Sequence, residues 1–178
     1  MLIKWNKVMN LVGRSEWEDV LERLVADSFY LADLLESLDL PESPECWDLG
    51  SGAGLPGIPL RMLWQKGQYT LVEAREKRAL FLRTVLSSAR LPGTSVFQGR
   101  AESFMPKRPQ ADLIVSRAFM PWQRLLALVE KYTVRQGFCV ILALEPLPRT
   151  LPGGWASLTD KHYTICRDTR FFWVLRKE

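Results

Sequence analysis

Histidine and cysteine are scarce in this sequence. Its 178 residues include a single histidine, His162, and three cysteines, Cys46, Cys139 and Cys166, without the spacing of metal ligands. An odd number of cysteines, two of them inside expected strands, is typical of buried, reduced thiols and not of a disulfide framework. We therefore expect a cytoplasmic protein with no bound metal, in which His162 is an ordinary structural or surface residue.

Long apolar runs are also missing. No uninterrupted run approaches the ~18 residues of a membrane span, and the segment from Met1 to Lys7 lacks the apolar core of a signal peptide. Membrane insertion and export are thus not expected. The length and the 47% hydrophobic content suit one domain, residues 1–178, with a substantial core. We expect it to be a monomer.

Acidic residues are outnumbered by basic ones. The formal net charge is +4 and the isoelectric point is about 9.1, which hints at a polyanionic partner, although an ordinary solvated surface is the alternative. The basic residues gather beside expected strand ends and turns, at Arg75/Lys77/Arg78, Arg100, Lys107/Arg108, Arg117 and Arg170/Arg176/Lys177.

The first 44 residues predict a helical cover. Residues 1–14 suit a helical turn or an arm, and Ser15 with Glu18 forms a capping-box pattern. Apolar residues then recur with the 3.6-residue spacing of an amphipathic helix that stops before Pro41. We expect this helix to cover a sheet formed by residues 45–178.

Strands and helices alternate in that remainder. The expected strands are 46–49, 69–72, 95–98, 111–116, 138–144, 163–167 and 171–175, and the expected helices are 56–64, 76–90 and 121–132. This order predicts an α/β fold, a doubly wound and mostly parallel sheet with helices on both faces and a C-terminal antiparallel strand pair.

A glycine-rich turn follows the first expected strand. Gly50, Gly52 and Gly54 alternate with other residues, which permits positive φ and close approach of a ligand. Gly52 to Gly57 also fits the G-x-G-x-x-G fingerprint of dinucleotide sites, whereas the register from Asp48 looks like motif I of class I S-adenosylmethionine-dependent methyltransferases. Glu73, at the end of the second strand, fits both because one carboxylate accepts both ribose hydroxyls.

Two observations favour the methyl donor. A dehydrogenase needs a substrate domain and an acid/base, and the chain offers one histidine. The segment Gly99-Arg100-Ala101-Glu102 directly follows the third strand. An apolar backbone there can flank an adenine while Glu102 accepts a hydrogen bond from its amine. The dinucleotide interpretation does not require this segment.

Several further motifs resemble one family, the RsmG group, also called glucose-inhibited division protein B. The matching pieces are Lys4 to Leu11, Ala26-Asp27-Ser28, Asp48 to Leu60, Lys77-Arg78, Phe81-Leu82-Arg83, Arg100 to Phe104 and Val115 to Phe119. The resemblance implies a Rossmann-like class I methyltransferase fold and S-adenosylmethionine-dependent methylation of guanine N7 in small-subunit (16S) ribosomal RNA. Leu24 and Glu145 depart from the family pattern, and a carboxylate at position 145 opposes phosphate binding.

The resemblance also implies roles for particular residues. The cofactor would be held by Gly50, Gly52, Gly54, Leu55, Glu73, Ala101, Glu102 and Arg117. The backbone of 16S RNA, free or in the small ribosomal subunit, would be contacted by Lys77, Arg78, Arg100 and Arg170. A surface ion pair is the alternative for Arg117, and a helix-surface role is the alternative for Lys77 and Arg78.

No catalytic residue in the strict sense is expected. Guanine N7 has a lone pair and no proton, so that methyl transfer needs positioning and removal of water but no general base. Two other functions stay open, a methyltransferase for a different substrate and a non-catalytic RNA-binding relative.

Overall fold

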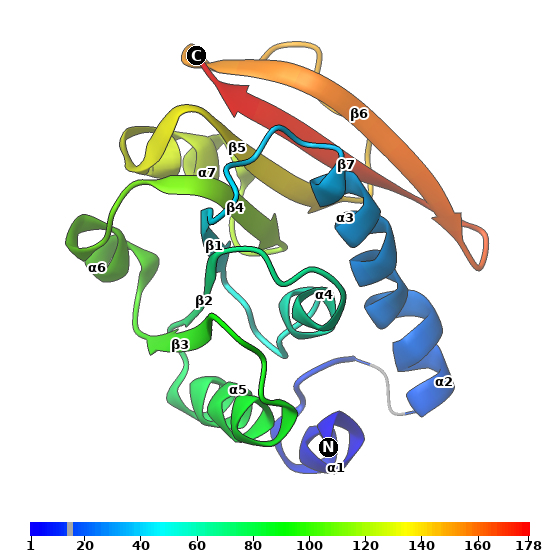
Figure 1. The fold of residues 1–178 in the computed structure, drawn as a ribbon. Coiled ribbons are helices and arrows are strands. Elements are labelled where there is room, and N and C mark those ends of the chain that lie inside the picture. The colour runs from blue at the N-terminus through cyan, green and yellow to red at the C-terminus, as the bar shows by residue number, and fades with distance from the viewer. Residues whose placement is uncertain (14–15) are drawn as a thin grey trace.

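The computed structural model describes residues 1–13 and 16–178, apart from the side chain of Asp160. A seven-stranded sheet has the order β3-β2-β1-β4-β5-β7-β6 (Figure 1). The strands are β1 (Glu45–Leu49), β2 (Gln68–Glu73), β3 (Thr94–Gln98), β4 (Ala111–Arg117), β5 (Thr133–Ala143), β6 (Trp155–Ile165) and β7 (Asp168–Lys177). β1 to β5 are parallel, and β7 runs antiparallel to both β5 and β6. The predicted fold class is confirmed.

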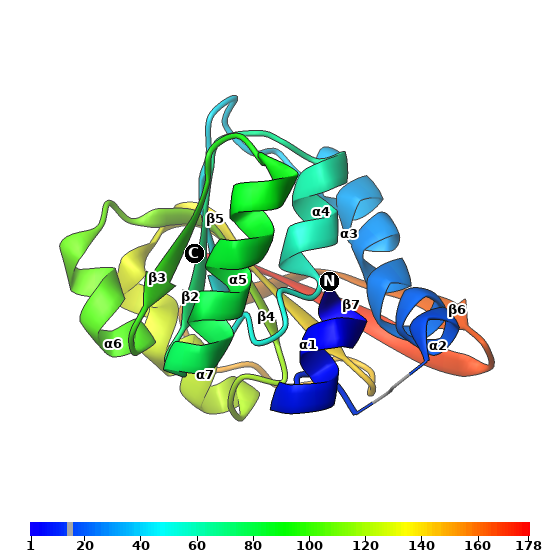
Figure 2. The ribbon, with the colours of Figure 1, turned by 90° about the horizontal axis from the view of Figure 1, so that it is seen from below.

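Helices cover both faces of this sheet (Figure 2). They are α1 (Leu2–Met9), α2 (Trp17–Val20), η1 (Leu21–Val25), α3 (Ala26–Glu36), α4 (Gly57–Leu63), α5 (Glu76–Ala89), α6 (Ala101–Phe104), η2 (Met105–Lys107), α7 (Trp122–Val129) and η3 (Glu130–Tyr132). One apolar cluster joins α3, α4 and α5 to the sheet, and a second joins α6 and α7 to the other face. The alternation of strands and helices in the sequence thus produces two cores around one sheet.

The N-terminal cover is a continuous helical segment that contains a π-helical turn. Segments α2, η1 and α3 follow one another without interruption, and η1 is a π-helical turn. Helix α3 ends at Glu36, earlier than the predicted boundary before Pro41, and Ser37 donates from Oγ to the carbonyl of Leu34 at 2.6 Å. A hydroxyl that bonds the backbone in this way competes with helix continuation. Ser15 of the expected capping box lies outside the described residues.

The last three strands are longer than predicted. β5 begins at Thr133, with a register shift against β4 and a positive φ of 65° at Gln136. Pairing between β6 and β7 extends from Trp155 opposite Lys177 to Ile165 opposite Asp168. The length of β6 was not evident from the sequence, because β6 is an edge strand, and an antiparallel strand with one solvated face needs few apolar positions. No described helix is long and apolar enough to cross a membrane.

A buried arginine forms hydrogen bonds with the loops at the amino ends of β2 and β3. Arg61 of α4 is fully buried and donates to the carbonyls of residues 64, 65, 66, 67 and 92 and to Thr94 Oγ1, at 2.7 to 3.3 Å. Burial lowers the pKa of this guanidinium. Its role is structural, since these loops lie at the amino ends of the parallel strands, whereas the glycine turn lies at the carboxyl ends.

Candidate functional site at the carboxyl ends of the parallel strands

The glycine turn between β1 and α4 has the conformation that its sequence predicts. Gly50, Gly52 and Gly54 have φ values of 76°, 55° and 75°. A Cβ on Gly50 would lie 2.5 Å from Cδ2 of Phe119, and a Cβ on Gly54 would lie 2.5 Å from Cδ1 of Ile58. Both positions therefore need glycine for space as well as for backbone conformation.

Glu73 fixes the turn to the end of β2. Its Oε2 accepts the Gly52 N–H at 2.9 Å and its Oε1 accepts the Arg75 N–H at 2.8 Å. The residue is only 6% exposed. A carboxylate held by two backbone donors keeps free lone pairs for a ligand's hydroxyl groups. Its position at the end of β2 agrees with the predicted ribose contact, which stays a prediction.

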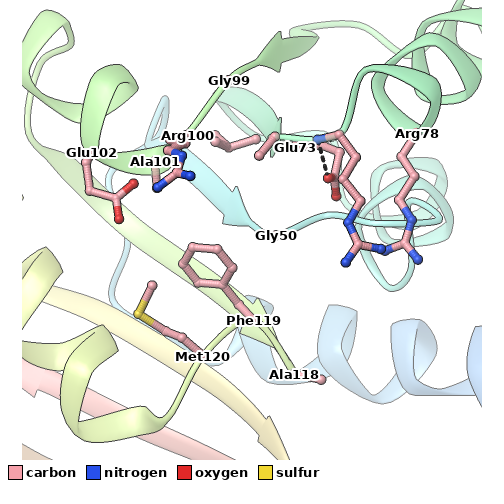
Figure 3. A pocket seen from close by; sticks show the side chains of 13 residues that line it. Gly50, Glu73, Arg78, Gly99, Arg100, Ala101, Glu102, Ala118, Phe119 and Met120 are labelled. Carbon is pink, nitrogen blue, oxygen red and sulfur yellow. Dashed lines mark hydrogen bonds between the residues drawn. The ribbon is translucent and has the colours of Figure 1, made fainter.

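A cavity of about 370 Å³ opens beside this turn (Figure 3). Four of the predicted cofactor residues line it, and they come from the ends of three strands: Gly50, Glu73, Ala101 and Glu102. The size suits a nucleoside-like ligand. It lies where the strand order reverses, which is where open α/β sheets bind their ligands.

Arginine side chains and residues that follow β4 also line the cavity. Arg78 and Arg100, predicted as RNA contacts, both line this cavity. Phe119 and Met120 do so as well and were not predicted as site residues (Figure 3). The signal for Phe119 was its place in the motif from Val115 to Phe119, of which only Arg117 was given a role.

The other predicted cofactor residues lie around the cavity and do not line it. Gly52, Gly54 and Leu55 belong to the turn, and Leu55 is 7% exposed and packs in the core. Arg117 stands one residue before Ala118, which does line the cavity. Lys77 is exposed on the first turn of α5. The structure therefore brings half of the predicted cofactor set to the cavity wall.

Arg117 and Arg170 meet on one buried carboxylate. Asp27 of α3 accepts from Nη1 of Arg117 at 3.1 Å and from Nη1 of Arg170 at 2.6 and 2.8 Å. The hydroxyl of Tyr163 donates to the same carboxylate at 2.9 Å. The Asp27 side chain is 3% exposed, while that of Arg117 is 24% exposed. Two guanidinium groups share one negative charge, so the cluster keeps a net positive charge beside the site.

Helix α3 is also bonded to the glycine turn. Ser28, next to Asp27, is fully buried and donates from Oγ to the carbonyl of Pro56 at 3.0 Å. The motif Ala26-Asp27-Ser28 thus connects the N-terminal cover to both the arginine pair and the turn. The sequence marked this motif as part of the resemblance without giving it a role.

Asp48 lies beneath the turn at the end of β1. Its side chain is 2% exposed, and burial raises its pKa to about 7, while the positive charge of Arg117 partly opposes the shift. Tyr69 Oη lies 3.5 Å from Oδ2 of Asp48. A Cβ on Gly57 would overlap the same carboxylate. The acid of the D-x-G-x-G-x-G pattern is therefore a packed support of the turn and not a lining residue.

The sheet order, the glycine turn and the acid at the end of β2 define a protein with the class I methyltransferase fold. A family described as rRNA small subunit methyltransferase G (GidB) matches residues 1–145. The chain belongs to this family.

Individual relatives are similar in sequence to this chain over nearly its whole length. The ribosomal RNA small subunit methyltransferase G of Nitratidesulfovibrio vulgaris is 57% identical over 176 residues, which are 99% of this chain and 81% of the relative. The protein of the same name from Lawsonia intracellularis is 51% identical over 179 residues, or 99% of this chain and 82% of the relative.

Solved structures share the fold at low identity. A mutant of MtNAS in complex with S-adenosylmethionine has a TM-score of 0.72 at 15% identity and covers 99% of this chain and 72% of its own. TrmN from Thermus thermophilus has a TM-score of 0.66 at 19% identity, covering 86% of this chain and 48% of its own. These similarities concern the fold alone.

Proposed function

We propose that this protein transfers a methyl group from S-adenosylmethionine to N7 of a guanine in small-subunit (16S) ribosomal RNA. The observation that carries the proposal is the cavity lined by Gly50, Glu73, Ala101 and Glu102 in a chain of this family. The names of the relatives from two other bacteria state methylation of the small-subunit RNA. The position on the base comes from the resemblance to the RsmG group.

The residues of the cavity fit the proposed methyl donor. Glu73 presents a fixed carboxylate to ribose hydroxyls, since two backbone N–H groups hold it in place. Gly50, which lines the cavity, lets Phe119 pack against the turn where a Cβ would otherwise stand. Ala101 and Glu102 offer an apolar surface and an acceptor for an adenine amine. When bound, S-adenosylmethionine supplies an electrophilic methyl group on a sulfonium.

Methylation of the acceptor atom requires no general base from the protein. Guanine N7 attacks with its lone pair and releases no proton, so we assign no catalytic residue. The chain's contribution is to hold the base against the methyl donor and to exclude water. His162 lies in β6, where its ring is 6.0 Å from that of Phe171, and it takes no part in the proposed reaction.

Arginines near the cavity are the proposed RNA contacts. Arg78 and Arg100 line its wall, and Lys77 is exposed on the same helix turn as Arg78. Arg170 forms an ion pair with Asp27. To contact a phosphate, its guanidinium must either bind Asp27 and the phosphate together or release Asp27. Cations placed in this way position a polyanion without reading its sequence.

The methyl-donor site is tested by thermal unfolding with added nucleotides. We expect S-adenosylhomocysteine at ~100 times its dissociation constant to stabilise the protein by about 2.7 kcal/mol, whereas NAD should leave the melting temperature unchanged. Glu73→Gln should lose most of this stabilisation. Glu76→Gln, an exposed change on α5 outside the cavity, should retain it. Stabilisation by NAD and not by S-adenosylhomocysteine would contradict the proposal.

A further inference from the structure

A second hollow lies between α1 and the first turns of α5, which run side by side in both views (Figures 1 and 2). Its volume is about 690 Å³, larger than that of the first cavity. Trp5, Val8, Met9 and Leu80 form its apolar part, and Val8 and Leu80 are 86% and 53% exposed. Exposed apolar and aromatic side chains around a hollow are typical of a binding surface.

The remaining wall of this hollow is cationic. Arg75, Lys77 and Arg78 line it, and Glu76 is the one carboxylate among its lining residues. Across residues 1–13 and 16–178, no ion pair within 4.0 Å engages any of these three cations. Their charge is therefore not neutralised within this part of the chain and attracts an anionic ligand.

The hollow adjoins the proposed methyl-donor site. Arg75 and Arg78 line both cavities. Nη1 of Arg78 lies 3.6 Å from where a Cβ on Gly52 would stand, so this guanidinium lies over the glycine turn. Trp5 is fixed in place by Phe81, with ring centroids 5.5 Å apart. A ligand in the hollow would thus contact two arginines that also line the first cavity.

We propose that the hollow holds an unpaired nucleotide of the RNA substrate, a neighbour of the methylated guanine along the strand. Its base packs on Trp5, Val8 and Leu80, and its phosphate lies against Lys77 and the two arginines. Aromatic surfaces combined with cations are the general means by which proteins hold single strands. The assignment rests on the proposed function, because it places a strand whose guanine enters the first cavity.

Oligonucleotide binding tests this assignment. The probe is a fluorescein-labelled 12-nucleotide oligouridylate, with binding followed by fluorescence anisotropy. Val8→Glu and Lys77→Glu should each weaken binding by ~10-fold, since one base contact or one phosphate contact is lost. The matched controls are Leu158→Glu on β6 and Lys131→Glu on η3, both exposed and outside the hollow, which should bind within about twofold of the native chain.

Salt dependence separates a phosphate contact from a general loss of structure. For a single strand, each neutralised phosphate contributes ~0.7 to the slope of log K against log salt, so Lys77→Gln should lower that slope by about 0.7. An oligonucleotide carrying 4-thiouridine should form photocross-links to the tryptic peptides that contain Trp5 or Leu80. An unchanged slope, or cross-links confined to other peptides, would overturn the assignment.

Failure of this assignment is distinguishable from failure of the proposed function. If S-adenosylhomocysteine stabilises the protein and the hollow variants bind RNA like their controls, the assignment is wrong and the function stands. If the hollow variants lose binding but S-adenosylhomocysteine has no effect, the RNA site stands and the methyltransferase proposal fails. A hollow that holds a segment of another protein would leave the RNA affinity of Val8→Glu and Lys77→Glu unchanged, which also overturns the assignment.

Discussion

Asp27 organises the positive charge beside the site. Its carboxylate is nearly inaccessible and receives Arg117, Arg170 and the hydroxyl of Tyr163. Burial raises the pKa of Tyr163, and the Asp27 charge adds to that shift, so the phenol remains a donor. One carboxylate accepts hydrogen bonds from both guanidinium groups. A substitution at Asp27 therefore affects Arg117 and Arg170 together.

We expect Asp27→Asn to destabilise the fold strongly. The amide leaves two partly buried arginines without their counter-charge, which costs ~3–5 kcal/mol for a broken buried pair. Asp168→Asn is the matched control, since Asp168 pairs with Arg23 at 3.0 Å but its side chain is 54% exposed. That change should cost less than about 1 kcal/mol. Urea unfolding measures both, and equal costs would contradict the role given to Asp27.

Asp48 gives stability a dependence on pH. Its pKa is about 7 in the fold and ~3.9 in an unfolded chain, so the folded state holds the proton over that interval. Stability attributable to Asp48 is complete below pH ~4 and is lost as pH rises to about 7, at about 1.4 kcal/mol per unit. The unfolding free energy of the native chain minus that of Asp48→Asn should fall across this window and then level off.

The control for this titration is Asp33→Asn, on the exposed side of α3. This exposed substitution should change the free energy of unfolding by less than about 0.5 kcal/mol. A flat difference for Asp48→Asn would mean that the carboxyl at the end of β1 is not held in its neutral form.

Among the elements, the turn from β1 to α4 is under a strong local constraint. Gly50 combines a φ of 76° with a Cβ position that Phe119 already fills. Gly50→Ala should therefore destabilise the protein by ~1–3 kcal/mol and weaken the binding of S-adenosylhomocysteine. Gly153→Ala is the control, because it has open space and no positive φ. Calorimetric titration with unfolding curves measures both, and normal cofactor affinity in Gly50→Ala would contradict this account of the turn.

The elements nearest the turn were the most predictable from sequence. Glycine spacing, Pro56 and the acid Glu73 are local signals, so the strand, turn and helix from β1 to β2 follow from short stretches of chain. The ends of β6 and β7 were not predictable, because cross-strand pairing over Trp155 to Lys177 determines their length. The end of α3 at Glu36, beside the side-chain hydrogen bond of Ser37, was not predicted either.

The site was predictable only where its residues follow strand ends. Glu73 ends β2 and Glu102 follows the end of β3 by four residues; both line the cavity, and their contacts with a ligand stay predictions. The pairing of Arg117 and Arg170 with Asp27 joins residues 90 and 143 positions apart, which no local pattern reveals. The approach of Phe119 to Gly50 is equally non-local.

At the scale of the whole molecule, charged groups converge on the carboxyl ends of the parallel strands. The cavity, the hollow beside α1 and the Asp27 cluster all adjoin the glycine turn, so one surface can hold a methyl donor, a base and the strand around it. Glu145 is a carboxylate shortly after the end of β5, and its backbone carbonyl accepts from Trp173 Nε1 at 2.8 Å.

The proposed reaction is methylation of guanine N7 in the RNA of the small ribosomal subunit. The direct measurement incubates the purified protein with methyl-labelled S-adenosylmethionine and small subunits from cells that lack the modification, followed by mass spectrometry of the nucleosides. We predict labelled 7-methylguanosine in 16S RNA, at about one per subunit, and no label in ribosomal protein. Label in protein, in small metabolites or at another base position, or no transfer at all from a donor that binds, would contradict the proposal.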